Sequence, residues 1–145
     1  MNTNIENCNK KLLEEQKEQL KHEIVYGENA GHFAVFDIEA GCRKTRTAER
    51  ALVDLYKIGK KAILVRRTDN DCRESMVNIN VMAGKDIAFA YNNEDVPTNN
   101  IMKVNSLLPN IPIVIITHQK YTVLMKDSSK RKIFAKNRDT LIIDE

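Results

Sequence analysis

The sequence alternates strand-length apolar runs with segments whose apolar residues recur at helical spacing. The apolar runs occupy residues 32–37, 62–66, 87–91, 113–117 and 140–144. They start about 25–30 residues apart, which is the length of a strand plus a crossover helix. Such alternation favours a parallel sheet with helices on both faces, joined by right-handed crossovers. We therefore predict an α/β fold with a mainly parallel five-stranded sheet.

Two of the connecting segments carry clear helix signals. Residues 48–55 have an apolar face at helical spacing, and Gly59 is placed to end that helix. Thr68, with Asp71 three residues later, forms a capping box, and Gly84 is placed to end the helix that it starts. These signals predict one helix before the second apolar run and another after it.

The other segments give weaker signals. Thr98 can cap a helix that Pro109 ends, and residues 118–125 suit a short helix at best. Residues 130–132, which read Lys-Arg-Lys, are interpreted as a solvated basic turn, with a phosphate-contacting loop as the alternative. An amphipathic helix over about residues 8–25 precedes the sheet. We expect that helix to pack against the sheet or against a partner.

Size and composition limit the possible classes of protein. With 145 residues, 42% of them hydrophobic and 30% charged, the chain has room for one compact domain with a core. We expect residues 1–31 to form the N-terminal helix and its connector, and residues 32–145 to form the domain. The three cysteines have no zinc-binding spacing, and no apolar run is long enough to span a membrane. A cytoplasmic protein that binds no membrane is the expectation.

The most informative segment follows the first apolar run. A buried strand, a turn of small residues, and then Lys44 and Thr45 at the start of a helix is the arrangement of a phosphate-binding loop. In that arrangement Lys44 reaches the β- and γ-phosphates, and the Thr45 hydroxyl binds Mg²⁺. Arg43 stands where the pattern has a glycine, at the closest approach of the backbone to phosphate. The pattern taken alone therefore fits imperfectly.

The last apolar run supplies the second half of a nucleotide site. It ends in Asp144 and Glu145, as the Walker B strand of a P-loop ATPase does. Asp144 would hold Mg²⁺ through water, and Glu145 would orient and polarise the attacking water. An Asp-Glu pair after a strand is commonplace by itself. Its joint occurrence with Lys44-Thr45 after the first run favours a nucleotide site.

Residues 33–145 resemble the N-terminal RecA-like motor domain of superfamily 2 DExx-box helicases, particularly those of phage and mobile elements. Residues 40–45 look like motif I, and residues 141–145 look like motif II. Residues 63–68 stand where motif Ia follows the second strand. Residues 114–119 stand at a strand end that touches the nucleic acid in many relatives. The resemblance implies a three-layer P-loop NTPase fold.

The resemblance also implies ATP and Mg²⁺ as cofactors, and weakly bound single-stranded DNA as a partner. It places catalysis on Lys44 and Glu145, and the metal on Thr45 and Asp144. The nucleotide-binding residues that it implies are Ala40, Gly41, Cys42, Arg43, Lys44, Thr45 and Arg46. The nucleic-acid contacts that it implies are Arg67, Thr68 and Thr117. From the residues alone, a helix N-cap at Thr68 is about equally expected.

Two departures from the family leave other hypotheses open. Arg43 replaces the glycine of motif I, and the sequence stops at Glu145, before the further strand and the second motor domain that supplies an arginine finger. We expect that the chain alone does not unwind nucleic acid. The alternative is a catalytically inactive relic or interaction module that forms homo-oligomers. A small-molecule kinase or a GTPase is disfavoured, because neither a lid-like Arg-rich segment nor a base-reading motif is present.

Overall fold

The computed structural model describes residues 3–27, 43–91 and 101–144, with side chains for 10–27, 43–91 and 104–144. The described elements are α1 (Thr3–Tyr26), α2 (Lys44–Lys57), β1 (Ala62–Arg66), α3 (Asp69–Ala83), β2 (Ala88–Ala90), α4 (Ile101–Leu107), the 3₁₀ turn η2 (Leu108–Asn110), β3 (Ile113–Thr117), α5 (His118–Lys126), α6 (Ser128–Ala135) and β4 (Thr140–Ile143). The order confirms an α/β chain.

The four described strands form one parallel sheet in the order β2-β3-β1-β4. Central strands β1 and β3 are in register from Ala62–Ile113 to Arg66–Thr117. Strand β4 is an edge of the described sheet, and its residues Leu141 and Ile143 are 44% and 46% exposed. The fifth predicted strand, residues 32–37, lies outside the described residues.

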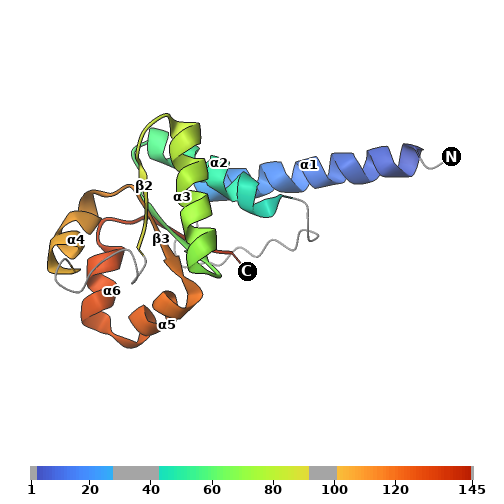
Figure 1. Cartoon of the computed structure of the whole chain (residues 1–145). Coiled ribbons are helices and arrows are strands. Elements are labelled where there is room, and N and C mark those ends of the chain that lie inside the picture. The colour runs from blue at the N-terminus through green and yellow to red at the C-terminus, as the bar shows by residue number, and fades with distance from the viewer. Residues whose placement is uncertain (1–2, 28–42, 92–100, 145) are drawn as a thin grey trace.

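Helices cover both faces of the sheet, as the alternation of elements predicts (Figure 1). On one face, α2 and α3 pack Leu52, Leu55 and Ile79 against sheet residues that include Leu64 and Ile115. On the other face, η2, α5 and α6 contribute Leu108, Leu124 and Phe134 to a second cluster with Val65, Val114 and Ile116. Burial on both faces explains why these strands read as continuous apolar runs.

The predicted helix boundaries around α3 are confirmed. The Thr68 hydroxyl accepts a hydrogen bond of 3.1 Å from the Asp71 N–H, and the Asp71 carboxylate accepts one of 3.2 Å from the Thr68 N–H. Gly84 ends the helix in the left-handed conformation, with φ of 72°. Gly59 follows the end of α2 with φ of 80°. Glycine tolerates this conformation without a Cβ clash.

The basic segment before β4 was predicted wrongly. Residues 130–132 lie in helix α6, not in a turn. The Asp127 carboxylate caps that helix by accepting hydrogen bonds from the Ser129 and Lys130 N–H groups. The role of Pro109 also differs from the prediction that it ends the helix. Helix α4 ends at Leu107, and Pro109 lies inside the 3₁₀ turn η2 that follows. A proline early in a helical turn is tolerated there because its missing N–H would have no partner.

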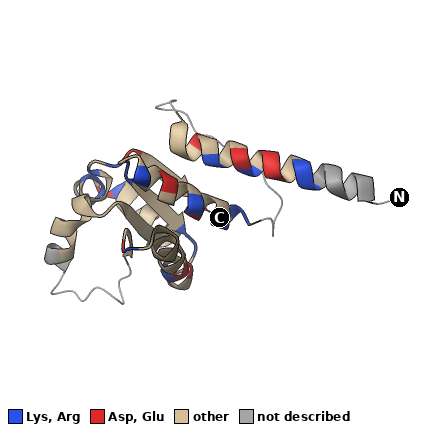
Figure 2. Cartoon of the chain, turned by 90° about the horizontal axis from the view of Figure 1, so that it is seen from above, with Lys and Arg blue, Asp and Glu red and all other residues tan. Residues whose placement is uncertain are grey.

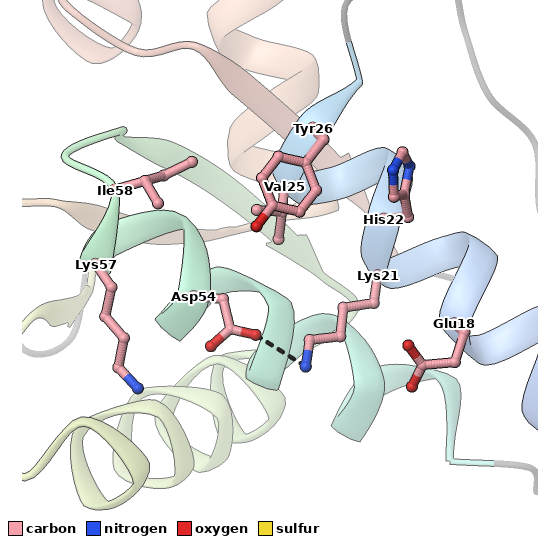
Figure 3. A pocket seen from close by; sticks show the side chains of 8 residues that line it. All are labelled: Glu18, Lys21, His22, Val25, Tyr26, Asp54, Lys57 and Ile58. Carbon is pink, nitrogen blue, oxygen red and sulfur yellow. Dashed lines mark ion pairs between the residues drawn. The ribbon is translucent and has the colours of Figure 1, made fainter.

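The N-terminal helix packs on α2, whereas the sequence predicted packing against the sheet or a partner. Val25 is buried there, and the Lys21 ammonium lies 2.9 Å from the Asp54 carboxylate (Figure 3). Acidic and basic residues alternate along α1 (Figure 2), and its first turns extend beyond α2 (Figure 1). Within the described ranges, none of the helices is long and apolar enough to cross a membrane.

Candidate functional site

The N-terminus of α2 meets the carboxyl end of β4. The Thr45 hydroxyl donates a hydrogen bond of 2.6 Å to the Asp144 carboxylate, across 99 positions of sequence. The Asp144 N–H donates to the Val65 carbonyl at 3.0 Å, which extends the pairing of β4 with β1 by one residue. The fold thus places the two predicted metal-binding residues side by side.

The first turn of α2 offers its backbone N–H groups without a side-chain cap. Arg43 is the N-cap residue, and its side chain makes no capping hydrogen bond. The first turn contains no acidic residue. Because the first N–H groups of a helix have no partner inside it, they form a site of positive potential that suits an anion. Lys44 opens this turn and is half-buried, while Arg46 is exposed.

Arg43 has the backbone conformation that a glycine would favour. Its φ is 59° and its ψ is 36°, which is left-handed. A side chain with a Cβ adopts that region at a cost of roughly 1–2 kcal/mol. The backbone thus adopts a glycine-type turn at this position in spite of the arginine, and the cost remains in the folded state.

Arg66, at the carboxyl end of β1, lies at the centre of a charged network beneath this site. Its guanidinium donates a 2.6 Å hydrogen bond to the Ser75 hydroxyl, which in turn donates to Glu49 at 3.0 Å. The guanidinium also lies 3.5 Å from Asp144, 3.7 Å from Glu49 and 3.8 Å from Asp71. One cation is therefore shared by three carboxylates from α2, α3 and the end of β4.

Glu49 is the most buried of these carboxylates, with only 1% of the residue exposed. Burial raises the pKa of its carboxyl above the ordinary value, and the hydrogen bond from Ser75 acts in the opposite direction. Its Oε2 atom has no hydrogen bond of ordinary geometry among the described residues, although the Asn78 amide is near enough to oppose the rise. The Arg66 guanidinium, 3.7 Å away, also favours the charged form of this carboxylate.

Our sequence analysis missed this network. Glu49 lies within the apolar face 48–55 of α2, where a charged residue is rarely buried without a partner. The position of Glu49 in the sequence therefore indicated that it has a partner. The sequence did not indicate which residues are its partners, because Arg66 and Ser75 come from β1 and α3.

His118 joins the site from α5. Its Nε2 atom lies 2.7 Å from the Asp144 backbone carbonyl, so the ring donates a hydrogen bond that holds the end of β4. We assigned no catalytic role to this residue from the sequence. Its contact is with the backbone of Asp144 and leaves the carboxylate to Thr45 and Arg66.

The three predicted nucleic-acid contacts have different surroundings. Thr68 and Thr117 are helix N-caps, whose hydroxyl oxygens accept from the N–H groups of Asp71 and Lys120, each at 3.1 Å. Each hydroxyl therefore has only its proton left to offer a phosphate. Arg67, between β1 and α3, is exposed. Arg67 is the one charged residue of the three.

Several predicted site residues cannot be placed. Ala40, Gly41, Cys42 and the catalytic candidate Glu145 lie outside the described residues. Within the described part, no group of three or more His, Cys, Asp or Glu side chains is arranged to hold a metal ion. A divalent ion at Asp144 would therefore take most of its ligands from water and phosphate, which is usual for Mg²⁺.

Comparison with known proteins found no matching family model and no significantly similar curated protein or solved structure. The geometry around Thr45, Arg66 and Asp144 is therefore what bears on function.

Proposed function

We propose that this chain binds Mg²⁺-ATP at the carboxyl end of its sheet, as the motor-domain portion of a helicase-like, nucleic-acid-dependent ATPase with a RecA-like P-loop fold. The observation that carries the proposal is the 2.6 Å hydrogen bond from Thr45 to Asp144. A Lys-Thr pair at a helix start and an acidic residue after a strand are individually common. Their side-by-side placement is what a P-loop ATPase requires of its two motifs.

The donor set fits a magnesium ion bound together with phosphate. Mg²⁺ prefers hard oxygen ligands and keeps several waters, so one hydroxyl and one carboxylate are a sufficient contribution from the protein. Thr45 is half-buried, and the Asp144 side chain is 17% exposed, so both remain reachable from solvent. When bound, Mg²⁺ would supply positive charge that neutralises the phosphate oxygens.

The other residues of the α2 N-terminus have matching roles. The Lys44 ammonium would bind the β- and γ-phosphates, and the N–H groups of the first turn would donate to phosphate oxygens. Within the described part of the chain, Lys44 takes part in no ion pair. Glu145, the predicted residue for orienting water, follows Asp144 directly.

The topology supports a site at this edge. In parallel α/β sheets, ligands bind beyond the carboxyl ends of the strands. Thr45, Arg66 and Asp144 all lie at that end of the sheet. Strand β4 has a neighbour only on the β1 side among the described strands. That arrangement is compatible with a further strand beside β4.

Titration calorimetry with Mg²⁺-ATP tests the proposal. We expect saturable binding by the unaltered chain, and a loss of at least about tenfold in affinity for Lys44→Ala, since it removes the main cation on the phosphates. Lys57→Ala, at the other end of the same helix, is the matched control and should bind like the unaltered chain. Equal affinity for the Lys44→Ala and Lys57→Ala variants would refute the nucleotide site and favour the non-catalytic interaction module.

A further inference from the structure

Arg66 is the one cation paired with Asp144 in the part of the chain that the structure describes. Its Nε atom lies 3.5 Å from Asp144 Oδ2, the same oxygen that accepts the Thr45 hydrogen bond. The Arg66 side chain is only 13% exposed, so water screens its charge little. The carboxylate proposed to face Mg²⁺ thus already has an internal counterion.

We infer that Arg66 competes with divalent cations for Asp144 and so keeps the metal affinity of the site low when no nucleotide is bound. This inference rests on the proposed metal role of Thr45 and Asp144. A metal ion bound at the Asp144 carboxylate would lie within a few ångströms of the guanidinium. Two cations that close repel each other, most strongly where solvent is excluded.

The surroundings of Arg66 fix it in this position. The Ser75 hydroxyl, Glu49 and Asp71 hold the guanidinium from α2 and α3, independently of Asp144. The guanidinium therefore keeps partners when the Asp144 carboxylate turns to another cation. Arginine side chains do not lose their proton in proteins, so the competition is built into the fold.

The test measures Mn²⁺ binding without nucleotide, from the electron paramagnetic resonance signal of the free ion. Arg66→Gln removes the competing charge, and Arg67→Gln removes the same charge from the adjacent, exposed position. We expect the Mn²⁺ affinity of Arg66→Gln to exceed that of Arg67→Gln by about tenfold or more, because one nearby positive charge opposes a divalent ion strongly. Adding Asp144→Asn to Arg66→Gln should remove the gain.

Arg66→Gln also leaves Glu49 buried without its cation, so that variant can fail to fold. The double variant Glu49→Gln/Arg66→Gln neutralises the buried pair together and keeps the net charge of the chain. It should fold, as circular dichroism would report, and show the same gain in Mn²⁺ affinity.

Three results would overturn the inference. Affinity equal to that of Arg67→Gln would make Arg66 a structural residue only. Weaker Mn²⁺ binding would mean that Arg66 holds Asp144 in place for the metal. A gain that survives Asp144→Asn would place the ion elsewhere. Because these readouts need no ATP, they are independent of the Lys44 test: the gain can occur without ATP binding, and ATP binding without the gain.

Discussion

The Thr45 hydroxyl and the Asp144 carboxylate form a 2.6 Å hydrogen bond that joins the start of α2 to the end of β4. The bond is charge-assisted and partly buried, which places it among the stronger hydrogen bonds of a protein. In the proposed site Thr45 would have two roles, because it orients Asp144 and would offer its own oxygen to the metal.

The first prediction concerns this bond. Thr45→Val keeps the shape of the side chain and removes the hydroxyl, so Asp144 loses its donor. We expect the free energy of unfolding to fall by about 1.5–3 kcal/mol, the range for hydrogen bonds to charged groups. We also expect the Mg²⁺ dependence of ATP binding to weaken, because the hydroxyl ligand is gone.

Thr47→Val is the matched control. The Thr47 hydroxyl bonds the Arg43 carbonyl within the same helix, at 3.1 Å, and has no contact with Asp144. Urea unfolding and calorimetry with and without Mg²⁺ would measure both effects. If the two variants lose Mg²⁺ dependence equally, the hydroxyl of Thr45 has no special role.

Local sequence signals predicted most of the described scaffold. Strands β1 and β3 begin and end where the apolar runs do, since both are buried on both faces. The capping box of Thr68 and Asp71 marks the start of α3 in the sequence as it does in the structure. Each of these signals depends on neighbours within a few residues, which a sequence shows directly.

The parts that were missed depend on contacts between distant segments. Helix α6 contains only Ile133, Phe134 and Ala135 as apolar residues, so its hydrophobic periodicity is weak. The helix is joined to the core by Phe134, which is buried in the second cluster. The Arg66 network joins α2, β1, α3 and β4. The location of Glu49 within an apolar helix face indicates that it needs a partner, but only the fold shows which residue that partner is.

A second prediction follows from the burial of Glu49. Because burial raises the pKa of this carboxyl in the folded state, the unfolded chain loses its proton first as the pH rises. The contribution of Glu49 to stability is therefore fully present below its unfolded pKa of 4.5 and is lost as the pH rises through the higher folded value. Glu49→Gln, which cannot titrate, should not show this loss.

The measurement is the difference in unfolding free energy between Glu49→Gln and the unaltered chain, followed by urea denaturation from pH 4 to pH 7. The difference should move in favour of the glutamine variant as the pH rises. A difference that moves toward the glutamate with rising pH would show that Arg66 outweighs burial.

A third prediction concerns nucleic acid. Arg67 is exposed at the carboxyl end of the sheet, whereas the Thr68 and Thr117 hydroxyl oxygens are engaged as caps. We expect weak binding of single-stranded DNA without base preference, and Arg67→Gln should weaken it for every sequence. The slope of log affinity against log salt should fall by about one, as expected for one lost phosphate contact.

Fluorescence anisotropy over a salt series would measure that slope. Lys57→Gln, on the far end of α2, removes the same charge and serves as the control. Binding that is unchanged in Arg67→Gln would exclude this strand end as a phosphate contact. Strong preference for one sequence would contradict a contact made only to the backbone.

The last prediction separates the backbone of Arg43 from its charge. Arg43→Gly and Arg43→Ala remove the same guanidinium, and they differ in that only alanine has a Cβ at the left-handed φ of 59°. The glycine variant should unfold with a free energy about 1 kcal/mol higher than the alanine variant, since the strain of the Cβ outweighs the greater freedom of unfolded glycine. Calorimetry should show that Arg43→Gly binds Mg²⁺-ATP more tightly than the unaltered chain, because the loop then reaches its phosphate-binding geometry without strain. Weaker binding by both variants would instead identify the Arg43 guanidinium as a phosphate ligand, with a loss of roughly 1–3 kcal/mol for a charged hydrogen bond.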